Sequence, residues 1–107
     1  MLSSERGRWL LGQSRAKREW SLLDENGQVS VLDFALKDAQ GWLVVDYKTG
    51  RPEADELPEA FGQRMLERYS SQLQRYCDQL RAFDGATPRA ALYFPRDDLW
   101  FEFVPEL

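Results

Sequence analysis

The chain has 107 residues, and its 43% hydrophobic and 13% aromatic content predicts one soluble globular domain rather than a disordered segment. Because the chain has no histidine and one cysteine, it excludes disulfide frameworks, zinc sites of the usual His/Cys kind, and Ser-His-Asp or Cys-His catalysis. The net charge of −4 argues against a protein that coats nucleic acid, although an enzyme can still act on DNA through a local basic strip.

Turn signals and hydrophobic periodicity divide the chain into a short helix, a three-strand meander, a long helix and a C-terminal hairpin. The expected helices cover residues 4–12 and 60–82, and the expected strands cover 18–24, 28–37, 42–48, 89–95 and 99–104. The turns are predicted at Glu25-Asn26-Gly27, which holds a strong hairpin dipeptide, at Asp38–Gly41, and at Gly85–Pro88. This order predicts an α/β or α+β fold with a small mixed sheet flanked by helices.

One face of the long helix is predicted to be buried. Its apolar residues recur at helical spacing, and they are Leu66, Leu73, Cys77 and Leu80. The single cysteine is therefore interpreted as a small buried hydrophobic residue.

Two aspartates are predicted to meet across the second and third strands. Side chains alternate along a strand, so Asp46 and Lys48 share one face about 6.5–7 Å apart. A four-residue loop at Asp38–Gly41 makes Lys37 face Trp42. Counting back four residues from Lys37 and forward four from Trp42 places Asp33 opposite Asp46, with Cβ atoms about 5 Å apart.

Like charges at opposed positions destabilise a sheet, and aspartate is disfavoured in strands. A divalent cation would offset this repulsion, because two carboxylates at that spacing form an oxygen clamp for Mg²⁺. The alternative is that Asp33 and Asp46 face solvent on an amphipathic sheet, with Lys48 as an ion-pair partner.

These residues resemble the D…(D/E)xK core of the PD-(D/E)xK nuclease superfamily. The string Val44-Val45-Asp46-Tyr47-Lys48-Thr49-Gly50 resembles the "VDYKT" segment of the RecB-like nuclease domain of UvrD/RecB-type helicase-nucleases. Val31-Leu32-Asp33 resembles the "ID" strand of that family, and Gln72 with Tyr76 resembles its QxxxY helix motif. The resemblance covers nearly the whole chain and implies a restriction-endonuclease-like core.

The resemblance implies a metal site and a role for each of its residues. Asp33, Asp46 and the backbone carbonyl of Tyr47 would bind Mg²⁺ or Mn²⁺, and Glu19 would be an additional acidic residue. An apolar strand edge or a contact with solvent is an equal alternative for Glu19.

The remaining implied roles are catalytic. Lys48 would orient or activate the attacking water and stabilise negative charge on the phosphorus centre. Gln72 and Tyr76 would position the DNA strand or the lysine.

The chain departs from the family pattern in one respect. RecB-like nucleases carry a histidine on an upstream helix as another metal ligand, and this chain has no histidine. It also has no Gly-rich Walker loop, so no helicase activity is expected. We therefore expect residues 1–107 to be a single nuclease domain, the C-terminal fragment or a short relative of a larger helicase-nuclease, with a helicase domain or subunit as partner.

Three arginines on the long helix suggest how DNA would be held. Arg64, Arg68 and Arg75 fall on neighbouring faces beside Gln72, which suits a DNA backbone. An ordinary solvated helix face explains the same arginines equally well.

Three functional hypotheses follow. The first is metal-dependent hydrolysis of DNA phosphodiester bonds by an exonuclease module in recombination or repair. The second is a catalytically impaired module with the nuclease fold that binds DNA or docks onto a helicase. The third is an unrelated small α/β domain. No apolar run approaches the roughly 20 residues that span a membrane, and the polar N-terminus lacks a signal region, so a cytoplasmic location is expected.

Overall fold

The computed structural model describes residues 5–24 and 26–106. Its elements are α1 (Glu5–Leu11), β1 (Lys17–Leu23), β2 (Val29–Asp38), β3 (Gly41–Tyr47), α2 (Pro58–Asp84), β4 (Arg89–Phe94) and β5 (Leu99–Phe103). The predicted mixed α+β layout is confirmed, with boundaries that shift by one or two residues. Two predicted positions, residue 4 in the first helix and residue 25 in the first turn, lie outside the described residues.

The five strands form one sheet in the order β1-β2-β3-β4-β5. Neighbouring strands are antiparallel, except that β3 and β4 run parallel. Parallel neighbours need a crossover connection, and α2 supplies it between β3 and β4. The predicted mixed sheet is therefore confirmed.

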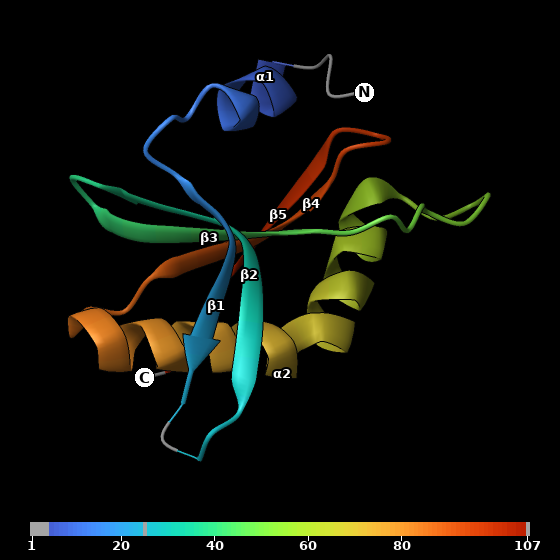
Figure 1. Ribbon diagram of the computed structural model, residues 1–107. Helices are drawn as coiled ribbons and strands as arrows, with labels where there is room; N and C mark the ends of the chain where they lie inside the picture. Colours follow the sequence, from blue (N-terminus) through green and yellow to red (C-terminus); the bar gives the residue numbers. More distant parts are fainter. Residues whose placement is uncertain (1–4, 25, 107) are drawn as a thin grey trace.

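The two helices cover opposite faces of the sheet, as Figure 1 shows. Under α2, the larger core cluster joins residues of the helix to Leu32 and Val44 of the sheet. Under α1, Leu10 packs against a second cluster that includes Phe34 and Val45. A residue on β2 or β3 is thus assigned to a face by the cluster it joins.

The turn between β2 and β3 is tighter than predicted. Its strands extend to Asp38 and Gly41, so the loop has two residues instead of four. Gly41 adopts φ 104°, a conformation that favours glycine. The register is unchanged, because Lys37 pairs with Trp42 as expected.

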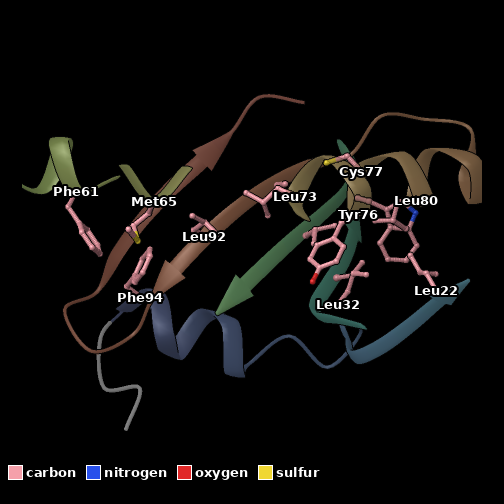
Figure 2. Packing of buried hydrophobic residues seen from close by; sticks show 14 residues of the cluster. Leu22, Leu32, Phe61, Met65, Leu73, Tyr76, Cys77, Leu80, Leu92 and Phe94 are labelled. Atoms are coloured by element: carbon pink, nitrogen blue, oxygen red, sulfur yellow. The ribbon is translucent and has the colours of Figure 1, made fainter. Parts of the chain in front are cut away.

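The long helix is bounded by residues that suit its ends. Pro58 occupies its first turn, where a missing N–H is tolerated, and Gly85 ends it with φ 84° and an N–H donated to the Arg81 carbonyl at 2.7 Å. The predicted stripe is confirmed for Leu73, Cys77 and Leu80, which are buried, and Leu66 is half-buried against the same cluster. Figure 2 shows Leu73, Tyr76, Cys77 and Leu80 gathered over Leu22, Leu32 and Leu92 of the sheet.

Within the described ranges, no helix is both long enough and apolar enough to cross a membrane.

Candidate functional site

The strand that carries Asp33 changes face at that residue. Leu32 and Ala35 both join the cluster under α2, whereas Phe34 joins the cluster under α1. Strict alternation would place Leu32 and Phe34 on one face, so β2 is bent between them. On the neighbouring strand, Glu19 is level with Asp33, because the pairs on either side are Arg18–Phe34 and Trp20–Leu32. Glu19 has a positive φ of 48°. Both strands therefore bend at the level of the first aspartate.

Asp33 is attached to β3 by its side chain. The pairing of β2 with β3 runs from Asp38–Gly41 to Phe34–Val45 and stops one residue short of Asp33. In place of the next ladder bond, the backbone N–H of Tyr47 donates to Asp33 Oδ2 at 2.9 Å. The bend thus brings the Asp33 carboxylate to the end of β3, beside Asp46.

Asp46 is a buried carboxylate. Its relative exposure is 4%, and its strand neighbours Trp42 and Val44 lie in the cluster under α2, so the predicted shared face is confirmed. Burial, helped by the adjacent Asp33 carboxyl and opposed by Lys48, raises the pKa of Asp46 from 3.8 to about 6. The Asp33 carboxyl is therefore close enough to affect the ionisation of Asp46.

Lys48 is the centre of several contacts from two elements. Its Nζ lies 3.0 Å from Asp46 Oδ2 and donates to Gln72 Oε1 on α2 at 3.1 Å. The same atom lies 4.1 Å from the centroid of the Tyr69 ring, also on α2. Gln72 contacts the lysine, one of the two roles implied for it, whereas the ion pair with Asp46 is the contact that the solvent-facing alternative expected for Lys48. Tyr69 is an additional contact.

Tyr76 reaches the same region from the interior. It is 5% exposed, and Figure 2 shows its hydroxyl pointing down from α2 toward the sheet. Burial raises its pKa, followed by the negative charges of Asp46 and Asp33, so the phenol lies in the field of both carboxylates. The pair Gln72 and Tyr76 is thus directed toward the aspartates and the lysine, one turn apart.

The donor set fits a magnesium-type ion better than a closed metal cage. In residues 5–24 and 26–106, no group of three or more His, Cys, Asp or Glu side chains is arranged to hold a metal. Mg²⁺ is commonly bound through one or two carboxylates, with water and substrate phosphate completing its shell. Asp46 Oδ2 is buried and lies 3.0 Å from the Lys48 ammonium. A divalent cation on this oxygen would therefore compete with the lysine.

Glu19 is exposed and does not form an acidic triad with Asp33 and Asp46 in the described part of the chain. Its level on β1 matches that of Asp33, but its role as an additional ligand stays a prediction.

The three arginines of α2 differ in their surroundings. Arg64 makes a two-pronged ion pair with Glu56, with N–O distances of 2.8 and 2.7 Å. Arg75 is half-buried in a groove of about 730 Å³ that none of Asp33, Asp46 and Lys48 lines. Arg68 is exposed, and its guanidinium lies 5.4 Å from the Tyr69 ring centroid. Arg68 is thus the arginine whose contacts connect it with Lys48.

The QxxxY motif includes Gln72 and Tyr76 but leaves out Tyr69. The position of Tyr69 three residues before Gln72 is the available signal, because residues three apart on a helix are neighbours. That spacing places the ring and the amide on one flank of α2, where both contact the Lys48 ammonium.

A scan of the chain against protein-family models gave no match, and a search of curated proteins gave none either.

Proposed function

We propose that this chain is a metal-dependent deoxyribonuclease domain of the PD-(D/E)xK type, similar to the RecB-like nucleases. The observation that carries the proposal is the meeting of Asp33, Asp46 and Lys48 at the end of β3. Two carboxylates and one ammonium at a single point are the groups needed to bind a divalent ion and a phosphodiester. In an unrelated small α/β domain, the aspartates would only decorate the surface. Asp46 is 4% exposed, which argues against that hypothesis.

The metal would be Mg²⁺ or Mn²⁺, held by the carboxylates of Asp33 and Asp46 and by the Tyr47 carbonyl. When bound, such an ion lowers the pKa of a bound water and offsets negative charge on the phosphoryl oxygens. Asp33 and Asp46 would fix the position of the ion relative to the sheet. Asp46 would also release the Lys48 ammonium when its own lone pairs bind the metal.

Lys48 would carry the second positive charge of the site. Its ammonium, 19% exposed at the side chain, can approach a phosphoryl oxygen or the attacking water from the α2 side. Gln72 Oε1 accepts a hydrogen bond from one N–H of the ammonium and thereby limits the directions in which the other two N–H groups point. Tyr76, with a raised pKa, would keep its proton at neutral pH and act as a hydrogen-bond donor.

The substrate would be DNA, and the physiological role would be that of an exonuclease module in recombination or repair, associated with a helicase domain or subunit in the cytoplasm. These parts of the proposal rest on the resemblance of the sequence to the family. The acid–base and metal-binding parts rest on the geometry of the aspartates and the lysine.

Nuclease assays on linear DNA test the proposal. With Mn²⁺ or Mg²⁺, the wild-type chain should degrade the DNA, and Asp46→Ala and Lys48→Ala should abolish degradation. Matched controls are Asp55→Ala, an exposed acid in the loop before α2, and Lys37→Ala, an exposed lysine at the far end of β2. Both controls should retain activity. Equal activity in Asp46→Ala and the wild type would refute the assignment.

Metal binding can be measured apart from cleavage. An ion that binds only the folded state raises the melting temperature. Mn²⁺ should therefore raise the Tm of the wild-type chain and of Asp55→Ala, but not that of Asp46→Ala.

A second candidate function is a DNA-binding or helicase-docking module with an impaired site. It is favoured by the two-carboxylate donor set of the described residues and by the absence of histidine from the chain. DNA binding without cleavage, even in a longer chain that includes any upstream helix, would support this candidate over the nuclease.

A further inference from the structure

Tyr69 contacts the lysine of the site through the face of its ring. It lies on α2, is half-buried, and packs against the core cluster between the helix and the sheet. Its ring centroid is 4.1 Å from Lys48 Nζ, well within the roughly 6 Å range of an effective cation–π contact. Packing against the core cluster fixes the position of the Tyr69 ring, and the ring in turn offers Lys48 Nζ a contact at a fixed place.

We infer that Tyr69 is a positioning residue that holds the Lys48 ammonium toward the substrate phosphate. The inference rests on the proposed function. It gives the ring the task of holding the ammonium together with Gln72 when Asp46 binds a metal.

Charge explains why the ring is suited to this task. Lysine has a flexible four-carbon side chain, so its ammonium needs partners to stay in one place. Asp46 holds the ammonium at 3.0 Å in the metal-free site. A metal on Asp46 would repel the ammonium and compete for the same oxygen. Tyr69 and Gln72 would then be the remaining contacts of Lys48 on α2.

An aromatic ring also holds a cation without neutralising it. A carboxylate in the position of Tyr69 would cancel the charge that a phosphate is meant to feel. The ring attracts the ammonium through its quadrupole and leaves the net charge intact. Arg68, 5.4 Å from the same ring centroid, adds a second cation at this point. The Tyr69 ring thus has two cations beside it, Lys48 and Arg68.

The substitutions Tyr69→Phe and Tyr69→Leu separate the ring from the bulk of the side chain. Phenylalanine keeps the ring face, and leucine keeps apolar packing but removes it. Phe83→Leu is the matched control, because Phe83 lies on the same helix and contacts Trp20 instead of Lys48. Tyr69→Met serves as a second ring-free variant if Tyr69→Leu does not unfold cooperatively.

The first readout is the NMR spectrum of lysine side chains in the isotopically labelled, metal-free chain. There are three lysines in the sequence, and Lys48→Arg identifies the resonances of Lys48. The ring current of Tyr69 should shift the Lys48 side-chain protons upfield in the wild type, Tyr69→Phe and Phe83→Leu. The shift should be lost in Tyr69→Leu. An unchanged Lys48 spectrum in a folded Tyr69→Leu variant would overturn the inference.

The second readout is the kinetics of DNA hydrolysis. Tyr69→Leu should lower kcat by about 3- to 30-fold with little change in KM, the range expected from losing one cation–π contact. Tyr69→Phe and Phe83→Leu should stay within about 3-fold of the wild type. Equal losses in Tyr69→Phe and Tyr69→Leu would overturn the role of the ring. If the wild type does not cleave DNA, the proposed function fails, while the Lys48 resonances still decide whether Tyr69 positions the lysine.

Discussion

Gly62 of α2 lies directly against the ring of Phe101 on β5, so closely that a Cβ on the glycine would overlap the ring. The Phe101 ring cannot move aside freely, because it also packs against Phe61 and Phe94. Helix and strand therefore approach one another at a distance that requires glycine.

The first prediction concerns this contact. Gly62→Ala should destabilise the fold by about 1–2 kcal/mol, since a steric cost of about 2–3 kcal/mol is offset by the roughly 1 kcal/mol that alanine gains in helix propensity. Urea denaturation measures the difference. Ser71→Ala, at an exposed position of the same helix, should stay within about 0.5 kcal/mol of the wild type. A Gly62→Ala variant as stable as Ser71→Ala would contradict the close packing.

The second prediction concerns the buried aspartate. An ionised Asp46 is costly in the metal-free fold, because it is 4% exposed and adjoins Asp33. Asp46→Asn should therefore raise the free energy of unfolding by about 1–3 kcal/mol at pH 8 without metal. Its folded pKa of about 6 exceeds the usual 3.8, so the wild type loses stability as pH rises through this interval.

The two proteins should accordingly have equal pH dependence below about pH 4, diverge in stability between about pH 4 and 6, and keep a constant difference above about pH 6. Thermal unfolding in EDTA across this pH range measures the difference, with Asp55→Asn as the exposed control. A wild type that stays as stable as Asp46→Asn at pH 8 would show that the carboxylate is well compensated without a metal.

The third prediction concerns the ion pair of the loop before α2. Arg64 lowers the pKa of Glu56 to about 2, so the pair contributes stability above the ordinary pKa of 4.5 and loses it as pH falls toward 2. Arg64→Gln should lower the Tm at pH 7 slightly, and the difference should vanish near pH 2. Added salt should reduce the difference at pH 7, because Arg64 is exposed to solvent ions and Glu56 is partly exposed. A difference that persists at pH 2 would point to lost packing.

The fourth prediction compares two arginines of α2 in DNA binding. Arg68 lies beside the Tyr69 ring, whereas Arg64 is engaged by Glu56. Arg68→Ala should weaken binding of single-stranded or linear duplex DNA by about 3- to 10-fold and reduce the salt dependence by about one counterion. Arg64→Ala should change the affinity less. Fluorescence anisotropy at several salt concentrations measures both affinities. Equal losses of affinity in Arg68→Ala and Arg64→Ala would mean that the arginines of α2 bind DNA as one basic strip.

The sequence predicted the elements and the register of the central hairpin because short turns restrict both. Gly41 permits a tight turn, and the pairing of Lys37 with Trp42 then determines which residues of β2 and β3 are opposed. The predicted loop was two residues too long, yet the pairing was right, because lengthening two strands equally into a loop leaves their register unchanged.

Other features depend on tertiary packing that periodicity does not encode. The period-two rule places Leu32 and Phe34 on one face, but the bend at Asp33 separates them into two cores. The parallel pairing of β3 with β4 was likewise not specified, because a crossover helix can return to either side of a strand. The contact of Tyr69 with Lys48 also depends on how α2 crosses the sheet.

The backbone at the end of β3 is tied to a different neighbour at each of two successive amides. The N–H of Tyr47 donates to the Asp33 carboxylate, and the N–H of Lys48 donates to the Tyr93 carbonyl of β4 at 2.9 Å. The main chain beneath the site is thereby clamped from both flanks, so hydrogen exchange at these amides should be slow. Any rearrangement at the end of β3 is then confined to side-chain rotation above a rigid main chain.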